Sequence, residues 1–145
     1  MSNEPFGLQL AKGKVYESKT VNKFGFNSAV GTDSETIWEQ GGEYSYPASA
    51  STMTLSSANT NDAAAGTGAR TITIFGLDAD YNEVSETLTL NGQTAVNTSN
   101  SYLRINRGIA RSAGSGGENA GIIYVGTGTV TAGVPANKYL TAWRG

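Results

Sequence analysis

The sequence contains no cysteine and no histidine. Without cysteine there are no disulfides, zinc–thiolate sites or thiol nucleophiles, and without histidine there are no Ser-His-Asp triads or HExxH zinc sites. Charged residues make up only 15% of the chain, whereas about a quarter is usual in globular domains. These absences remove most catalytic chemistry, so we expect that the protein is not an enzyme and that it uses no cofactor and no metal ion.

Long apolar runs and an excess of positive charge are also missing. No apolar run approaches the roughly 18 residues that a membrane-spanning helix needs, and the first ten residues, MSNEPFGLQL, lack the apolar centre of a signal peptide. The formal net charge of −2 gives no general attraction to nucleic acid. We therefore expect a soluble protein with neither a membrane nor a nucleic acid as its partner.

Strict alternation of apolar and hydroxyl residues dominates the segment from Arg70 to Leu90, RTITIFGLDADYNEVSETLTL. Such alternation is typical of a half-buried sheet. One face carries Ile72, Ile74, Leu88 and Leu90, and the other carries Thr71, Thr73, Ser85, Thr87 and Thr89. The segment predicts two strands joined by a polar tip, with an outward hydroxyl surface suited to contact.

The rest of the chain divides into an N-terminal arm over 1–35, extended or partly helical, and a β domain over 36–145. Turn-rich stretches such as GGEYSYP, NTSNS and GVPAN separate the candidate strands. The expected strands are Thr36–Gln40, Thr52–Ser57, Arg70–Leu77, Val84–Leu90, Tyr102–Ala110, Ala120–Gly126, Gly128–Ala132 and Lys138–Trp143. Seven or eight short strands at this spacing predict an all-β fold, a β-sandwich or jelly roll.

The polar tip from Asp78 to Glu83 alternates oxygen-bearing side chains in a D-x-D-x-N pattern. Calcium sites use such spacing, but the Gly and the distal Glu of an EF-hand loop are absent. The same pattern also forms plain turns, in which Asp and Asn side chains bond their own backbone. The carboxylates could also serve a glycosidase, but no aromatic-lined cleft is indicated. We expect a solvated turn rather than a calcium or catalytic site.

Aromatic and basic residues supply candidate contact positions, because Trp, Tyr and Arg are favoured at protein interfaces. For IWEQGGEYSYP the simpler interpretation is a core tryptophan with a rim of tyrosines, and for the arm it is an ordinary first strand and turn. In a regular strand, Arg104 and Arg107 are expected on opposite faces because their separation is odd, so we expect ion pairs within or between subunits instead of one basic patch. The interface candidates are Phe24, Phe26, Trp38, Tyr44, Tyr46, Arg104 and Arg107.

Several segments together resemble structural proteins of tailed double-stranded DNA phages. They are VNKFGFN, ETIWEQGGEYSYP, TNDAAAGTGARTITIFGLDADYNEVSETLTLNG and NSYLRINRGIARSAGSGGENAGII. The similarity is to small virion proteins of marine and cyanobacterial podoviruses, described as head decoration, cement or head-fibre proteins. It covers roughly residues 20–134, and the GTGAR, GLDADYNE and ETLTLNG stretches are its most specific part.

The resemblance implies a capsid decoration or cement protein that binds and stabilises the outer surface of the major capsid shell. Its partners would be the major capsid protein and further copies of itself, as a homotrimer or other homo-oligomer. It would be located on the virion after assembly in the host cytoplasm. The alternative is a tail or head-fibre module that contacts the host-cell surface. Relatives of this type often continue into further β-structure, whereas this sequence ends at LTAWRG, which favours the cement role.

Overall fold

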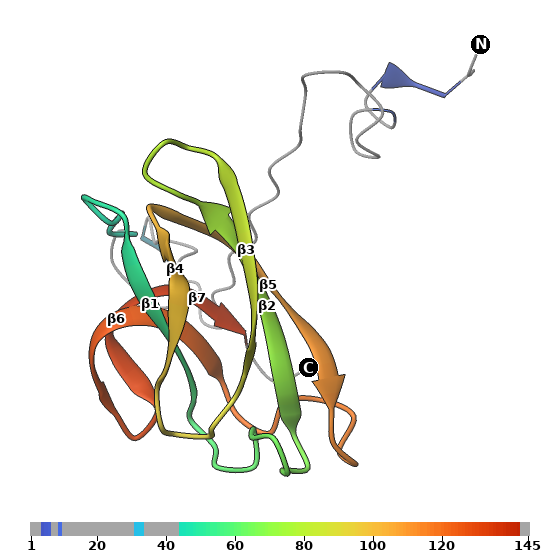
Figure 1. The fold of residues 1–145 in the computed structure, drawn as a ribbon. Coiled ribbons are helices and arrows are strands. Elements are labelled where there is room, and N and C mark those ends of the chain that lie inside the picture. The colour runs from blue at the N-terminus through green and yellow to red at the C-terminus, as the bar shows by residue number, and fades with distance from the viewer. Residues whose placement is uncertain (1–3, 7–8, 10–30, 34–43, 143–145) are drawn as a thin grey trace.

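The computed structural model describes residues 4–6, 9, 31–33 and 44–142 of the chain. These described residues contain seven strands (Figure 1). They are β1 (Ser51–Ser57), β2 (Ala69–Leu77), β3 (Glu83–Thr89), β4 (Val96–Tyr102), β5 (Arg104–Ala113), β6 (Ile123–Thr131) and β7 (Val134–Ala142). Every strand pair is antiparallel, so the predicted all-β class is confirmed.

The strands form two sheets that pack face to face as a β-sandwich (Figure 1). One sheet has four strands in the order β4-β1-β6-β7, and the other has three in the order β3-β2-β5. Alternate residues of each strand point between the sheets and exclude water from a single apolar core. That core consists of Met53, Leu55, Ala69, Ile72, Ile74, Leu90, Tyr102, Ile105, Ile123 and Val125.

The β2–β3 hairpin forms as its alternation predicted. Register pairs Ile72 with Leu88 and Thr73 with Thr87, and directly opposed residues share one face of a sheet. The side chains of Ile72 and Ile74 are buried, whereas Ser85, Thr87 and Thr89 are exposed. The apolar face therefore closes the core and the hydroxyl face points away from it.

Strand β4 corrects the prediction that NTSNS is a turn. Val96, Thr98 and Tyr102 face inward at alternate positions, although Asn and Ser fill the rest of the strand. A bulge sets residues 98–100 opposite Met53, and the Thr98 hydroxyl accepts a hydrogen bond from the Met53 backbone nitrogen at 2.8 Å. The strand is held by pairing with the distant β1, which turn propensity cannot reveal.

The β6–β7 hairpin corrects two further boundaries. The two strands predicted over 120–126 and 128–132 are the single strand β6, which is bulged between Thr127 and Val130. The predicted GVPAN turn lies mostly within β7, because the tight turn sits one residue earlier, at Ala132 and Gly133. Both of these residues have positive φ, 49° and 81°, as a two-residue hairpin loop requires.

Other expectations lie wholly or partly outside the described residues. The strand predicted over Thr36–Gln40 falls in the undescribed range 34–43, and most of the arm predicted over 1–35 is also outside. In the described part of the chain, no helix has the length and apolar character to cross a membrane.

Candidate functional site

Three tyrosines and an arginine gather beside the start of β5, and we call them the tyrosine cluster: Tyr44, Tyr46, Tyr139 and Arg104. The rings of Tyr44 and Tyr46 meet edge to face with centroids 4.7 Å apart, and the Tyr44 hydroxyl donates to the Tyr139 carbonyl at 3.3 Å. The Arg104 guanidinium lies 4.9 Å from the Tyr46 ring centroid. The cluster thus ties the segment before β1 to β5, an edge strand of the three-stranded sheet, and to β7, an edge strand of the four-stranded sheet.

Within this cluster, Tyr46 remains largely in contact with solvent. Its exposed fraction is 56%, while the neighbouring Tyr44 is half-buried, and burial raises the Tyr44 pKa to about 12. Arg104 is fixed by hydrogen bonds from Nη1 to the carbonyls of Pro47 at 3.1 Å and Leu103 at 2.8 Å. An exposed ring held by well-packed neighbouring side chains is a suitable anchor for a protein contact, because little side-chain entropy is lost on binding.

The outward side of the β3-β2-β5 sheet, which we call the outer face, is the second surface. Its hydroxyls bond in pairs across strands: Thr71 with Ser112 at 2.6 Å, and Thr73 with Thr87 at 2.7 Å. The hydroxyl surface expected from the sequence is therefore present except at Thr73, which is buried and accepts a hydrogen bond from Arg111. Neighbouring side chains preset the orientation of the hydroxyl groups.

Two arginines lie across the only aromatic ring of β2. The guanidinium carbons of Arg107 and Arg111 lie 4.5 Å and 5.8 Å from the Phe75 ring centroid, and Arg111 Nε donates to the Thr73 hydroxyl at 2.9 Å. Neither arginine forms an ion pair with a carboxylate in the described part of the chain. The outer face therefore carries two oriented positive charges that are not neutralised there.

The prediction that Arg104 and Arg107 occupy opposite faces is wrong. Register pairs Arg104 with Leu77 and Arg107 with Phe75, and these two β2 residues are separated by two positions. The register shift between Phe75 and Gly76 is a bulge that adds one residue to β5. Because of this extra residue, Arg104 and Arg107 point to the same face although three positions separate them. The two arginines nevertheless contact different rings, Tyr46 and Phe75.

The tip of the β2–β3 hairpin forms a turn as expected. Residues 78–82 and Glu83, the first residue of β3, are called the acidic turn below. Asp78 Oδ1 accepts hydrogen bonds from the backbone nitrogens of Asp80 and Asn82, both at 2.9 Å. The bond from the Asn82 backbone is the main cause of a lowered Asp78 pKa. Among the described residues no group of acidic side chains has the arrangement of a metal site.

Asp62 is a feature that sequence reasoning missed. Its side chain is fully buried, and Oδ1 accepts hydrogen bonds from the backbone nitrogens of Ala69 at 2.7 Å and Ala120 at 2.8 Å. Oδ2 accepts from the Gly121 nitrogen at 2.9 Å and from the Ser57 hydroxyl at 2.5 Å. One carboxylate therefore joins the end of β1, the start of β2 and the loop between β5 and β6.

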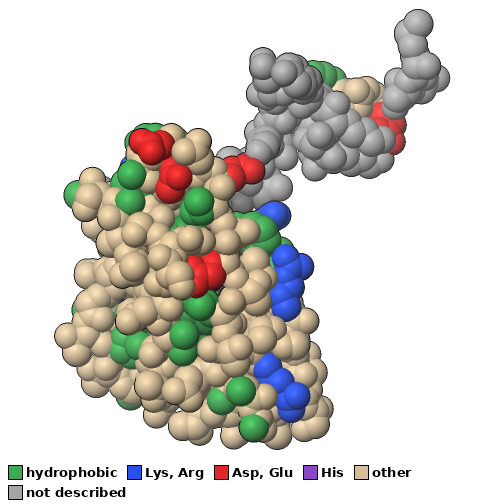
Figure 2. All heavy atoms as spheres, in the orientation of Figure 1, with side chains coloured by type: hydrophobic (Ala, Val, Ile, Leu, Met, Phe, Trp, Pro, Cys, Tyr) green, Lys and Arg blue, Asp and Glu red, His purple; other side chains and the backbone are tan. Residues whose placement is uncertain are grey.

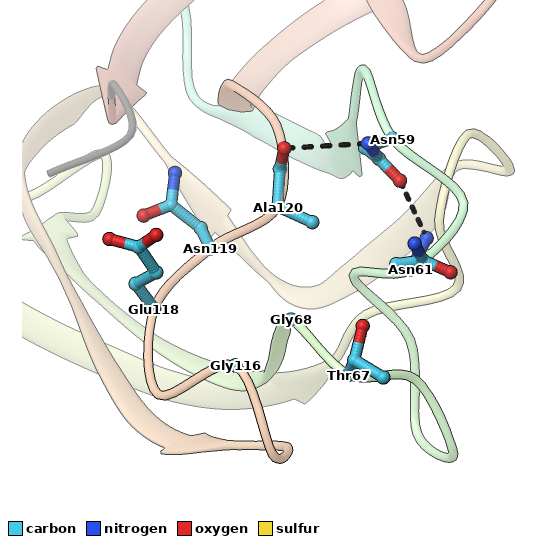
Figure 3. Close-up of a pocket in the computed structure, with 8 residues that line it drawn as sticks. All are labelled: Asn59, Asn61, Thr67, Gly68, Gly116, Glu118, Asn119 and Ala120. Atoms are coloured by element: carbon cyan, nitrogen blue, oxygen red, sulfur yellow. Dashed lines mark hydrogen bonds between the residues drawn. The ribbon is translucent and has the colours of Figure 1, made fainter.

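A polar recess of about 250 Å³ opens beside these loops. Figure 3 shows its eight lining residues: Asn59, Asn61, Thr67, Gly68, Gly116, Glu118, Asn119 and Ala120. Its amides largely serve the fold, because Asn59 Nδ2 donates to the Ala120 carbonyl at 3.4 Å and Asn119 Nδ2 to the Gly121 carbonyl at 2.7 Å. A methyl group on Gly68 would lie 2.1 Å from Asp62 Oδ1, so the recess is the outer surface of the Asp62 network.

Of the seven interface candidates, the structure brings together Tyr44, Tyr46 and Arg104. Arg107 is on the same sheet face as Arg104 but contacts Phe75 instead of the tyrosines. Phe24, Phe26 and Trp38 lie outside the described residues. Sequence reasoning did not find Tyr139 or the stacking of Phe75 with arginine. A single Phe in a strand otherwise rich in threonine was a signal for the stacking. Which arginines contact this ring depends on the β2–β5 pairing, which the sequence does not show.

These features define a β-sandwich domain with a cluster of tyrosines beside the start of β5 and a basic, hydroxyl-rich sheet face. No family model, no curated protein and no solved structure matches the chain.

Proposed function

We propose that this protein is a structural component of a tailed double-stranded DNA phage particle, a capsid decoration or cement protein bound to the outer surface of the major capsid shell. The proposal rests on the resemblance of residues 20–134 to such virion proteins and on one structural observation. That observation is the tyrosine cluster, in which the exposed Tyr46 ring is held between Tyr44 and Arg104.

The tyrosine cluster is the part of the domain that we assign to shell binding. Tyr and Arg carry much of the energy of protein interfaces, since each covers a large area with few lost rotamers. Arg104 is already fixed to the Pro47 and Leu103 carbonyls, so it needs little further ordering on binding. A modest contact repeated at many positions of a shell gives a large total stabilisation by multivalency.

The test compares phage particles with and without the protein. We expect hundreds of copies per particle and earlier loss of DNA on heating when the protein is missing. About a dozen copies or fewer would instead support the alternative, a tail or head-fibre module. Particles that keep their DNA equally well without the protein would contradict the cement function.

The assigned surface is tested by adding purified variants back to depleted particles. Tyr46→Ala removes the exposed ring and is expected to raise the dissociation constant for the shell, measured from occupancy over a range of protein concentrations, at least about tenfold, the effect of losing about 1.4 kcal/mol of binding energy. Asn97→Ala, which alters an exposed residue on β4, is the matched control and should bind like the wild type. Equal occupancy for the two variants would exclude the tyrosine cluster as the shell contact.

A further inference from the structure

The charges on the β3-β2-β5 sheet are separated into two groups. Figure 2 shows acidic side chains at the end of the molecule that carries the β2–β3 turn and basic side chains along the β5 side. No lysine or arginine occurs between Arg70 and Arg104, so Asp78 and Asp80 have no basic neighbour in sequence; within the sheet, Arg104 lies opposite Leu77, which precedes the turn. One molecule thus presents two surfaces of opposite charge.

The basic surface has two guanidinium groups that can bind a carboxylate. Arg107 and Arg111 lie against the Phe75 ring, which limits their motion and leaves the guanidinium N–H groups directed to other partners. Both side chains are exposed. A planar guanidinium binds a carboxylate with two parallel hydrogen bonds, so this site matches a protruding acidic side chain.

The acidic surface is the exposed turn at the end of the β2–β3 hairpin. The Asp78 side chain holds the turn, but the Asp80 side chain forms no hydrogen bond or ion pair within the described residues. Beside it, Tyr81 has a positive φ of 62° and an exposed fraction of 63%. A large aromatic ring next to a carboxylate at the tip of a hairpin is a suitable element to lie against Phe75 and its arginines.

We propose that the acidic turn of one copy of this chain binds the Arg107 and Arg111 side chains on the outer face of a second copy. Both halves of the contact belong to one sheet, so a closed symmetric assembly satisfies each turn with a neighbour's arginines. The inference uses side chains other than those of the tyrosine cluster, which we assigned to the shell contact.

A second copy fits this face better than a nucleic acid does. Phosphate backbones are bound by stripes of many lysines and arginines, whereas this face has two arginines and the chain has a net charge of −2. Strand spacings of about 4.8 Å and rises of about 3.3 Å give the face roughly 400 Å², about half of the ~800 Å² per partner in a stable interface. The self-association should therefore be weak, concentration-dependent and sensitive to salt.

The experiment measures the mass of the isolated full-length protein by analytical ultracentrifugation over a range of protein and salt concentrations. We expect a reversible oligomer whose dissociation constant rises about tenfold or more in Arg107→Glu and in Asp80→Arg. The double variant should regain association, because the reversed charges attract again. Lys138→Glu, on β7 of the opposite sheet, changes the net charge equally and should associate like the wild type.

Three results would overturn the inference. They are a monomer at millimolar concentration, equal association of Arg107→Glu and Lys138→Glu, and a double variant that associates no better than either single variant. Circular dichroism checks that each variant is folded, and the two single variants alter different exposed positions. Because no phage particle enters the measurement, its failure would leave the decoration function standing.

Discussion

The Glu86 carboxylate on β3 accepts a hydrogen bond from the Ser99 backbone nitrogen on β4, with 2.8 Å between Oε1 and N. Its second oxygen accepts from the Asn100 nitrogen at 3.0 Å. Both amides lie in the bulge where β4 departs from its register with β1, so the ladder does not satisfy them. A side chain from the facing sheet thus completes the hydrogen bonding of an irregular edge strand.

Replacing Glu86 with alanine should loosen this edge. Two backbone amides lose a charged acceptor, so we expect the free energy of unfolding to fall by about 1–2 kcal/mol. Amide hydrogen exchange at Ser99 and Asn100 should become faster than in the wild type. Asp80→Ala removes an exposed carboxylate and serves as the control, with unchanged exchange at both amides. Unaltered protection in Glu86→Ala would show that β4 does not depend on this side chain.

Asp62→Ala should be the most damaging single change of a polar residue in the described part of the chain. It leaves three backbone N–H groups without their acceptor in a buried site, and we expect a loss of about 3 kcal/mol or more by denaturant unfolding. Asp62→Asn keeps one oxygen and should cost less. An alanine variant as stable as the asparagine variant would contradict this account.

Tyr102 makes the stability of the protein sensitive to alkaline pH. Its ring is fully buried and its hydroxyl has no hydrogen-bond partner among the described residues; burial raises the pKa of Tyr102. The unfolded state therefore loses its proton near the ordinary value of about 10, while the folded state retains it. The contribution to stability is complete below pH 10 and declines as pH rises through the folded pKa.

Tyr102→Phe tests this relationship without changing the shape of the core. At pH 7 we expect stability equal to that of the wild type, because no hydrogen bond in the described structure is lost. Above pH 10 the variant should lose less stability than the wild type, as measured by urea unfolding at pH 8, 10 and 11. Parallel pH profiles for the two proteins would rule out the proposed role of this hydroxyl.

Alanine substitution at two glycines with positive φ distinguishes the cost of backbone strain from the cost of steric overlap. A methyl group on Gly133 (φ 81°) would lie 1.8 Å from the Ser57 carbonyl oxygen, whereas one on Gly117 (φ 74°) would meet nothing within 4 Å. We expect Gly117→Ala to cost about 1 kcal/mol from conformation alone, and Gly133→Ala to cost several-fold more. Thermal melting of both variants measures the difference, and equal melting temperatures would contradict it.

How far the sequence predicts the fold depends on whether a segment's pattern is local. The β2–β3 hairpin was predictable because Ile72, Ile74, Leu88 and Leu90 alternate strictly with hydroxyl residues. Strand β4 was not, because its buried Thr98 is polar and its partner Met53 is 45 residues away.

The contact surfaces were predictable only in part. Tyr44, Tyr46 and Arg104 were expected at interfaces from residue type, yet their meeting requires the segment before β1 to cross β5 and β7. A bulge places Arg104 and Arg107 on the same face of the sheet instead of on opposite faces, and bulges leave no clear mark in a single sequence. Asp62 resembled an ordinary loop acid, since one of its partners, Gly121, is 59 residues away.

The Asp62 network gives the loop end of the sandwich a cohesion that its composition would not suggest. Asn, Gly and Thr loops usually open independently of the sheets that they connect. Here the single buried Asp62 carboxylate is shared by the last residue of β1, the first residue of β2 and the loop before β6, so none of the three can move away without breaking its hydrogen bond to Asp62. This end of the molecule therefore acts as a small polar core, and it should unfold together with the sandwich rather than before it.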